Sequence, residues 1–455
     1  MATTAARPAA ETAIETRYRE RTSGSAAQYE RALASLPGGD MRTIAYHAPY
    51  PLAIDRAQGA ILTDVDGNEY VDFLNNYTSL IHGHAHPRLV ATATEQLKRG
   101  SAYAAASANQ AELAGILRER VASVDAVRFT NSGTEAAMNA IRAARAFTGR
   151  PLLVKMEGGY HGTYDATEVS IHPDPAAAGP AEAPRPVAEG RGLTPGAVAD
   201  TLVLPFNDAA AAERLFAARG GDLAAVIVEP LLGSGGMIPA TREYLQRLRD
   251  LTAAHGALLV FDEVMTFRVG PGGAQEVHGI QPDLTLFAKI IGGGFPVGAF
   301  GGRAEIMAQY DPRRADHLYQ SGTFNGNPVT MAAGVAAMEE LTPDAFARLN
   351  AFGDKLRAGL EEAGRAAGVP LVATGLGSLV NLHLTTGPVS DYRSAAASDR
   401  EAHRLVHLAL LNRGIFAAPR GMFNISTPMG EDHIDAAVDA VQDALSEVKA
   451  VSRWA

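Results

Sequence analysis

A single lysine in the stretch LTLFAKIIGGGFPVGAFGG, residues 284–302, is the first candidate for chemistry. Lys289 follows an apolar run and precedes a string of glycines, in a chain whose 40 basic residues are mostly arginines. A buried ammonium group is costly unless it is paired or loses its charge. A lysine amine in such a place can act as a nucleophile that forms a Schiff base with an aldehyde, which a guanidinium cannot do.

An acidic pair ends another apolar run, LLVFDEVMT. Asp262 and Glu263 follow the residues LLVF, so one of the two carboxylates is expected in the crevice at a strand end. Because Lys289 ends the next apolar run, an aspartate and a lysine are predicted at the tips of neighbouring strands. The simpler alternative is that these two side chains form an ion pair with each other.

Two further motifs follow predicted strands. In FTNSGTEAAMNAIRAA, Ser132, Gly133 and Thr134 stand at a helix start, where free backbone amides and the helix dipole favour a phosphate. In KMEGGYHGTYD, Tyr160 and His161 follow two glycines, where an aromatic side chain could cover a flat ring. The simpler alternatives are a capped helix end and a turn that carries a core aromatic.

Together these residues meet the requirements of pyridoxal phosphate. The lysine binds the aldehyde, the aspartate keeps the pyridine nitrogen protonated, the aromatic covers the ring and the helix start holds the phosphate. The chain has no GxxxxGK[ST] motif and no strand-linked GxGxxG motif, so the sequence does not predict a loop that binds ATP or a dinucleotide.

Composition sets the outer limits of the prediction. A chain of 455 residues with 47% hydrophobic and 20% charged residues is typical of a globular protein with two or three domains. The net charge of −10 argues against a nucleic-acid or anionic-membrane surface. The lack of cysteine excludes disulfides, thiolate metal sites and a cysteine nucleophile, and no metal site is predicted. No apolar run reaches the roughly 20 residues needed to span a bilayer, and the first residues do not resemble a signal peptide, so we expect a cytoplasmic enzyme.

Short apolar runs alternate with helical stretches from about residue 120. Several runs are continuous rather than alternating, which predicts an α/β fold with a mostly parallel sheet covered on both faces. The predicted strands are residues 126–130, 152–156, 201–205, 223–230, 257–264 and 284–288. Residues 172–200 are rich in Pro, Ala and Gly, and we expect a surface excursion there.

Long segments closely resemble the class III (ω-) aminotransferases of PLP fold type I, over nearly the whole chain. These segments are DVDGNEYVDF, TNSGTEA, VEP, DEVMTFRVGPGGAQEVHGIQPDLTLFAKIIGGGFPVGAFGGRAEIM and YQSGTFNGNPVTMAAG. The resemblance implies a mostly parallel central sheet between helices and a smaller α+β domain formed by both termini. We expect residues 1–75 to join the small domain, residues 76–330 to form the large PLP-binding domain, and residues 331–455 to complete the small domain.

The resemblance also implies roles for single residues. Lys289 is similar to the Schiff-base lysine, and Asp262 to the partner of the pyridinium nitrogen. Thr323 resembles a threonine that reaches the phosphate of the other subunit's cofactor, which implies a homodimer with shared active sites. The implied cofactor contacts are Ser132, Gly133, Thr134, Tyr160, His161, Glu229, Asp262, Val264, Lys289 and Thr323.

Two branches of the family compete for this chain, glutamate-1-semialdehyde 2,1-aminomutase and the β-phenylalanine aminotransferases. The segments PGGDMRTIAYHAPYP, NNYTS and AAPRGMFNISTP depart from the mutase pattern and match the aminotransferases. That match implies that Arg42 binds the substrate carboxylate, that Tyr77 lines the substrate pocket and that Arg420 handles the acceptor's carboxylates.

We therefore predict ping-pong transfer of an amino group from a β-amino acid, such as β-phenylalanine, to 2-oxoglutarate or pyruvate. The alternatives are the aminomutase and a broad ω-amine:pyruvate aminotransferase. A binding or scaffold module without catalysis is a third, less favoured class.

Overall fold

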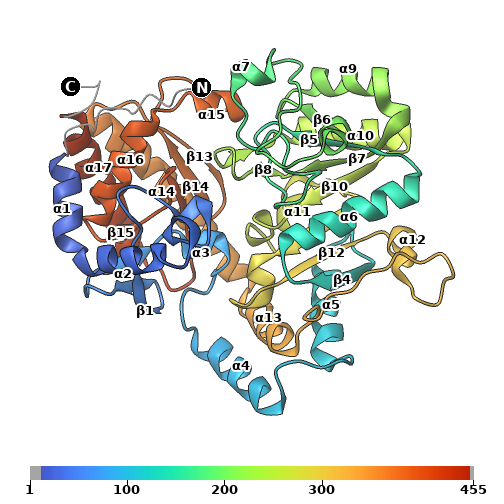
Figure 1. Ribbon diagram of the computed structural model, residues 1–455, viewed down its shortest axis with the longest axis horizontal. Coiled ribbons are helices and arrows are strands. Elements are labelled where there is room, and N and C mark those ends of the chain that lie inside the picture. Colours follow the sequence, from blue (N-terminus) through green and yellow to red (C-terminus); the bar gives the residue numbers. More distant parts are fainter. Residues whose placement is uncertain (1–11, 451–455) are drawn as a thin grey trace.

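The computed structural model describes residues 12–450, and its largest feature is a seven-stranded sheet (Figure 1). All pairings are parallel except those of β12, which runs antiparallel to both neighbours. In spatial order the strands are β4 (Ala126–Thr130), β12 (Gly298–Gly302), β11 (Leu284–Ala288), β10 (Leu258–Asp262), β7 (Leu223–Val228), β5 (Leu152–Met156) and β6 (Thr201–Leu204).

Helices cover both faces of this sheet because its strands carry apolar side chains on both sides. Along β10, Leu258 and Val260 pack toward α6 (Gly133–Thr148). Leu259 and Phe261, which point the other way, pack with α9 (Ala209–Arg219) and α10 (Arg242–His255). We call the sheet and its covering helices the large lobe.

The two ends of the chain build a second body, the small lobe, whose blue and red elements lie together at the left of Figure 1. One sheet joins β1 (Ile54–Gln58), β2 (Ile61–Asp64), β3 (Glu69–Asp72) and β15 (Ile415–Phe416). Another joins β13 (Val372–Leu376), β14 (Leu379–His383) and β16 (Met422–Asn424). The helices packed around them are α1 (Ala13–Arg21), α14 (Pro343–Ala367), α16 (Arg400–Leu411) and α17 (Glu431–Lys449).

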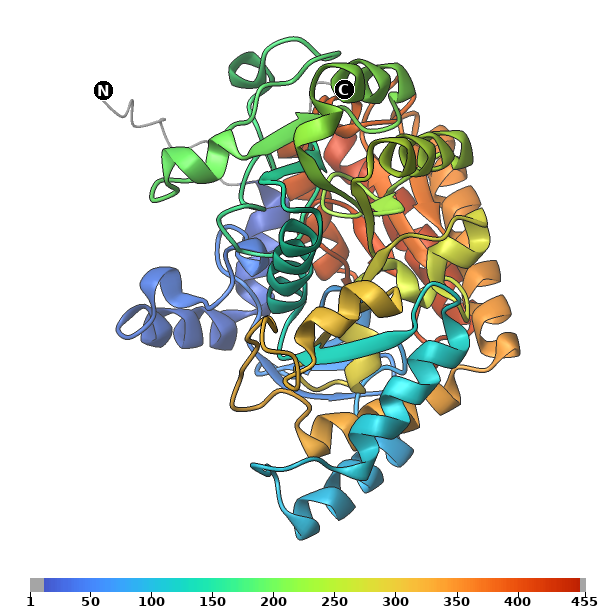
Figure 2. The same cartoon turned by 90° about the vertical axis from the view of Figure 1, so that its right-hand side faces the viewer.

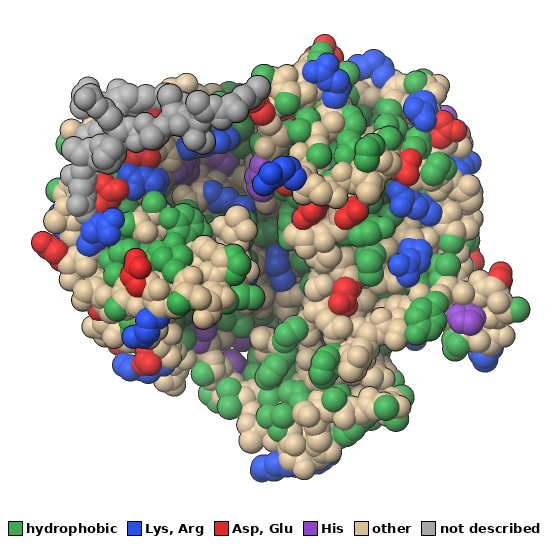
Figure 3. Space-filling view, in the orientation of Figure 1, with side chains coloured by type: hydrophobic (Ala, Val, Ile, Leu, Met, Phe, Trp, Pro, Cys, Tyr) green, Lys and Arg blue, Asp and Glu red, His purple; other side chains and the backbone are tan. Residues whose placement is uncertain are grey.

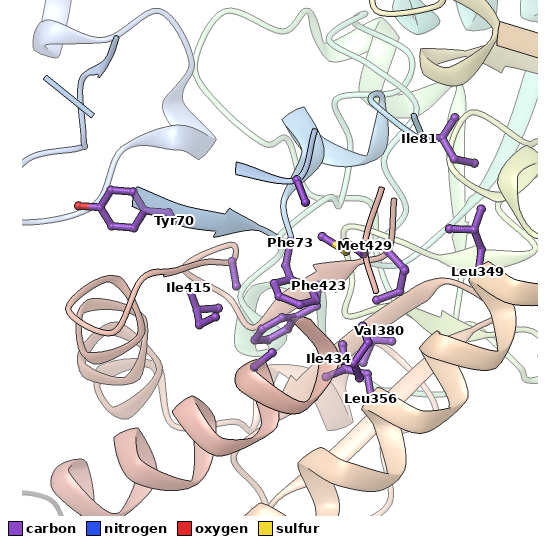
Figure 4. Close-up of a cluster of buried hydrophobic side chains, with 14 of the residues drawn as sticks. Tyr70, Phe73, Ile81, Leu349, Leu356, Val380, Ile415, Phe423, Met429 and Ile434 are labelled. Atoms are coloured by element: carbon purple, nitrogen blue, oxygen red, sulfur yellow. The ribbon is translucent and has the colours of Figure 1, made fainter. Parts of the chain in front are cut away.

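The core of the small lobe joins residues that are far apart in the sequence (Figure 4). The rings of Phe73 and Phe423 meet edge to face, with centroids 5.7 Å apart. Leu356 of α14 and Ile434 of α17 are fully buried beside them. Burial of such side chains stabilises the fold by about 1.5–3 kcal/mol each, so the N-terminal segment is held to the C-terminal helices.

The remaining helices, 3₁₀ turns and strands complete the fold, which Figure 2 shows from the side. The helices are α2 (Ser23–Leu33), α3 (Asn75–Thr78), α4 (Pro87–Arg99), α5 (Ala108–Arg120), α7 (Pro175–Ala178), α8 (Pro195–Ala199), α11 (Gly273–His278), α12 (Ala304–Met307), α13 (Pro328–Glu340) and α15 (Tyr392–Ala396). The 3₁₀ turns are η1 (Pro37–Gly39), η2 (Thr43–Ala45), η3 (Gly220–Asp222), η4 (Thr266–Arg268), η5 (Lys289–Gly292) and η6 (Ala308–Tyr310), and β8 (Leu231–Leu232) pairs with β9 (Ile238–Pro239).

The α/β prediction is confirmed, and all six apolar runs form strands of the large sheet. Residues 172–200 form the expected excursion, with only the short helices α7 and α8. Strand β12 was missed because its sequence, GAFGG, lacks the β-branched residues that mark a strand. No helix within residues 12–450 is long and apolar enough to cross a bilayer. The domain limits at residues 75 and 330 and the cytoplasmic location stay predictions.

Candidate active site

A cavity of about 390 Å³ lies at the carboxyl ends of β10 and β11. These strands are parallel neighbours with Asp262 opposite Leu286, so Asp262 and Lys289 reach the same edge of the sheet, as predicted. The predicted site residues that line this catalytic cavity are Arg42, Tyr77, Ser132, Gly133, Thr134, Tyr160, His161, Glu229, Asp262, Val264 and Lys289.

Lys289 opens the turn η5 with a φ of 53°, a left-handed conformation that costs a residue with a side chain about 1–3 kcal/mol. Its amine has no ion-pair or hydrogen-bond partner within residues 12–450. Limited solvation lowers the pKa of Lys289 to about 8, although the carboxylates of Asp262 and Glu229 oppose that shift. Lys289 therefore combines a strained backbone with an amine that loses its proton more easily than an exposed lysine does.

Asp262 is buried and is held by two contacts. Its Oδ2 lies 2.8 Å from Nδ1 of His161, and its Oδ1 accepts a hydrogen bond of 3.0 Å from the amide of Val264. Among the described residues, Asp262 pairs with His161 and does not form an ion pair with Lys289, which was the simpler alternative. Glu263 turns away from the cavity and accepts hydrogen bonds from the amides of Ala274 and Gln275 and from Thr266.

The start of α6 offers backbone donors for an anion. The side chain of Ser132 caps the amide of Glu135 at 3.2 Å, which leaves the amides of Gly133 and Thr134 without intrahelical partners. The loop before residue 163 presses on this turn, since a Cβ added to Gly162 would lie 2.4 Å from Oγ1 of Thr134. A small anion such as a phosphate group fits this arrangement.

Glu229 positions the loop that carries Tyr160. Its Oε2 accepts the amide of Tyr160 at 3.0 Å, and its Oε1 accepts the amide of Gly233 at 3.1 Å. Burial raises the pKa of Glu229, and the negative charge of Asp262 raises it further. Tyr160 is 43% exposed and lines the cavity, where its ring can cover a flat ligand.

Arg42 is held on the substrate side by a residue that the sequence did not single out. Its Nη1 donates to Oδ1 of Asn76 at 2.8 Å, and its guanidinium lies 5.5 Å from the ring centroid of Tyr77. The hydroxyl of Tyr77 donates to the carbonyl of Ile44 at 2.7 Å. All four residues of α3 (Asn75–Thr78) have positive φ, from 45° to 73°. The Asn-Asn pair was the available signal, because asparagine tolerates this conformation best.

Two predicted residues lie outside the lining of the catalytic cavity. Arg420 borders a second cavity, and its Nη1 lies 3.3 Å from Oγ of Ser234, another residue that sequence reasoning missed. Its charge still acts on Lys289 and Tyr160: it adds to the lowering of the pKa of Lys289 that burial causes, and it opposes the rise in the pKa of Tyr160 that burial causes. Thr323 lies exposed in the loop between η6 and α13, so its predicted cofactor contact is not made within one chain.

Comparison with known proteins places this site in a family. A family model described as aminotransferase class-III matches residues 44–445. The chain belongs to the class III aminotransferases. A crystal structure of an omega-transaminase from Sphaerobacter thermophilus is 48% identical, with a TM-score of 0.92, and the match covers 95% of this chain and 99% of that one.

Two further similar proteins bear on the substrate. A β-phenylalanine aminotransferase from Variovorax paradoxus is 39% identical with a TM-score of 0.86, and the match covers 94% of this chain and 96% of that one. A glutamate-1-semialdehyde 2,1-aminomutase from Methanothermobacter thermautotrophicus is 41% identical over 425 residues, which is 92% of this chain and 98% of the relative.

Class III aminotransferases use pyridoxal phosphate, and the residues of the catalytic cavity fit this group. The unpaired amine of Lys289 suits its aldehyde, and the buried carboxylate of Asp262 suits its ring nitrogen. The open amides of Gly133 and Thr134 suit its phosphate. The protein is therefore a PLP-dependent aminotransferase.

Proposed function

We propose that this enzyme moves the amino group of a β-amino acid, such as β-phenylalanine, to 2-oxoglutarate or pyruvate in two half-reactions. The observation that carries this proposal is Arg42, which lines the same cavity as Lys289 and is held by Asn76. A guanidinium binds a carboxylate through two parallel hydrogen bonds. A donor fixed there by its carboxylate can direct a β-amino group toward Lys289.

Each residue of the site has a task in this reaction. Bound pyridoxal phosphate supplies an aldehyde that accepts the amino group and a ring that takes up electrons. Lys289 removes the proton from the donor carbon through Nζ, as a general base. Asp262, oriented by His161 and the amide of Val264, would hold a proton at the ring nitrogen. The turn at residues 132–134 would bind the phosphate, and Tyr160 would cover the ring.

Arg420 is our candidate for binding the acceptor's carboxylates. It approaches the cavity from the small lobe, and within residues 12–450 its side chain donates to the hydroxyl of Ser234 rather than to a carboxylate. An arginine with so weak a partner is available for an anionic ligand. The resemblance of the segment AAPRGMFNISTP to the β-phenylalanine aminotransferases supports this assignment.

The aminomutase is the second candidate, because several curated relatives at 40–41% identity carry that name. The mutase needs no external acceptor, since it moves an amino group within one molecule. Arg42 and Arg420 offer separate sites for the carboxylates of a donor and of an acceptor. Two such sites favour the aminotransferase, because the mutase uses no acceptor. A broad ω-amine:pyruvate aminotransferase would need neither arginine for its donor.

We also propose a homodimer with shared active sites. Thr323 is exposed, and the same loop exposes 74% of Tyr319 and 57% of Phe324. Large exposed aromatic side chains on one segment are typical of a protein interface. Across that interface Thr323 would donate a hydrogen bond to the phosphate bound by the partner subunit.

A panel of donors tests the proposed reaction. β-Phenylalanine, β-alanine, 1-phenylethylamine and glutamate-1-semialdehyde are each incubated with holoenzyme and 2-oxoglutarate or pyruvate, and product is measured. We expect β-phenylalanine to react only with an acceptor and to exceed 1-phenylethylamine, which lacks the carboxylate. Arg42→Met should remove that difference, whereas turnover of the semialdehyde alone, without acceptor, would establish the mutase.

A further inference from the structure

A second cavity, of about 610 Å³, lies between the two lobes beside the catalytic cavity. Its walls come from the loop between β8 and β9, from β14 and α15, and from the start of α16. Arg420 and Ser234 stand in its wall, and the charge of Arg420 is close enough to act on Lys289 of the catalytic cavity. Figure 3 shows this hollow between the lobes, with lysine or arginine and histidine side chains in and beside it.

The lining of this interlobe cavity has a one-sided charge. Arg400, Arg404 and Arg420 line it, whereas none of the described lining residues is an aspartate or glutamate, in a chain of net charge −10. Arg404 is neutralised by Glu15 at 2.7 Å and Glu401 at 2.6 Å. Such a cavity attracts a negatively charged group.

Arg400 is the least compensated of these arginines. It is exposed, and it has no hydrogen-bond or ion-pair partner within residues 12–450. It is the first residue of α16, where the helix dipole disfavours a positive charge and adds positive potential. The carboxylate of Asp399 offsets part of this positive potential, since it accepts a hydrogen bond of 3.1 Å from the amide of Ala402 at the helix start. A cation in this position is better placed to meet an anionic ligand than to stabilise its helix.

Four buried histidines add neutral hydrogen-bonding groups to the walls. Burial lowers the pKa of His47, His383 and His403 to about 4 each and that of His407 well below its usual range. Among the described residues, both ring nitrogens of His407 and Nδ1 of His47 lack a hydrogen-bond partner. Residues 12–450 contain no cluster of three or more side chains suited to a metal ion. Buried imidazoles without hydrogen-bond partners are costly, so these rings make the walls of the cavity polar without adding charge.

We propose that the interlobe cavity binds the far end of the amino donor, so that the enzyme accepts β-amino acids whose side chain ends in a second carboxylate. This inference rests on the proposed function, in which Arg42 binds the first carboxylate. A volume of about 610 Å³ is within the range of pockets that enclose a whole small ligand, and exceeds what pyruvate needs. The second carboxylate would pair with Arg400, past Arg420.

Two donors of equal length separate charge from size. 3-Aminooctanedioate ends in a carboxylate and 3-aminooctanoate ends in a methyl group. With holoenzyme and a 2-oxo acid, we expect kcat/KM to favour the dicarboxylate by about tenfold, mainly through KM, as for one hydrogen-bonded charge pair. Equal kcat/KM values for the two donors would overturn the proposal.

Three variants locate the effect. Arg400→Met should abolish the preference while leaving β-phenylalanine turnover unchanged, and Arg191→Met, at another exposed arginine, should keep it. Ala396→Phe fills the cavity from α15 and should weaken both long donors but not β-phenylalanine. A preference that survives Arg400→Met would place the second carboxylate elsewhere and refute the assignment.

Direct binding keeps this test separate from the proposed function. If neither β-phenylalanine nor any other β-amino acid reacts, the proposed function fails. Calorimetry on the holoenzyme can then still show whether the interlobe cavity binds a carboxylate. Octanedioate should then bind about tenfold more tightly than octanoate, and Arg400→Met should remove the difference. Equal binding of the two acids to the unaltered enzyme would contradict the proposed anion site.

Discussion

At Lys289 a left-handed backbone, an unpaired amine and a lowered pKa coincide. Only the neutral amine attacks an aldehyde, so the pKa of about 8 decides the pH at which the cofactor-free enzyme captures pyridoxal phosphate covalently. We expect the capture rate to rise through a midpoint near pH 8 and to level off only above that midpoint. Stopped-flow absorbance measures this rate, and a midpoint near the ordinary value of 10.5 would contradict the lowered pKa.

Asp262 and Glu263 are adjacent buried carboxylates with different tasks, which makes them matched probes. Asp262→Asn keeps the shape and removes the charge beside His161. We expect the half-reaction with donor to slow by about 10²–10⁴-fold, as for loss of a group that controls a proton. The measurement is single-turnover absorbance of the holoenzyme.

The control is Glu263→Gln, which alters the hydrogen bonds to the amides of Ala274 and Gln275. It should cost about 1–3 kcal/mol of stability in denaturant unfolding and leave the half-reaction rate of folded enzyme nearly unchanged. Equal kinetic losses in both variants would mean that the charge of Asp262 has no special role.

At the scale of elements, α3 (Asn75–Thr78) is unusual because four consecutive non-glycine residues form a left-handed turn. Each such residue costs about 1–2 kcal/mol, so outside contacts must hold the turn. Arg268, fully buried, donates to the carbonyl of Thr78, and the side chain of Asn75 donates to the carbonyl of Asn424. The turn places Asn76 and Tyr77 against Arg42.

A pair of substitutions at Asn76 separates strain from substrate binding. Both Asn76→Gly and Asn76→Ala remove the hydrogen bond to Arg42, so each should raise KM for the donor about fivefold, or about 1 kcal/mol. Only the alanine should lower the melting temperature, because glycine adopts a positive φ without strain. A KM change in one variant alone would indicate that Asn76 does not position Arg42.

The sequence predicted what depends on local pattern and strand order. Asp262 and Lys289 were placed together because parallel neighbouring strands end at one edge, and the start of α6 was marked by its capping residues. It did not predict that His161 rather than Lys289 partners Asp262, because that choice depends on a loop conformation. Nor did it find Asn76 or Ser234, whose contacts with Arg42 and Arg420 join residues 34 and 186 positions apart in the sequence.

At the scale of the whole molecule, the catalytic machinery and the substrate contacts belong to different lobes. Lys289 and Asp262 end strands of the large sheet, whereas Arg42 and Arg420 come from the N- and C-terminal segments. Those segments are tied together by Glu15 and Arg404 and by the hydrogen bond from Asn412 to the carbonyl of Ile14. Small movements between the lobes would therefore change substrate binding without disturbing Lys289.

The shared site proposed for the dimer predicts that two inactive variants restore each other. Lys289→Ala removes the essential amine, and Thr323→Asp places a negative charge where the partner's cofactor phosphate would bind. In a two-fold symmetric mixed dimer, one site combines the intact Lys289 of one subunit with the intact Thr323 of the other. The remaining site carries both defects.

Equal amounts of the two variants, dissociated and reassociated together, should recover about a quarter of unaltered activity, since half the dimers are mixed and each has one intact site. Activity is followed with β-phenylalanine and 2-oxoglutarate, and sedimentation confirms that dimers form. As a control, Lys289→Ala mixed with Asp262→Asn should recover nothing, because both residues belong to the same chain's site. No recovery in the first mixture, with dimers present, would show that Thr323 does not serve the partner subunit.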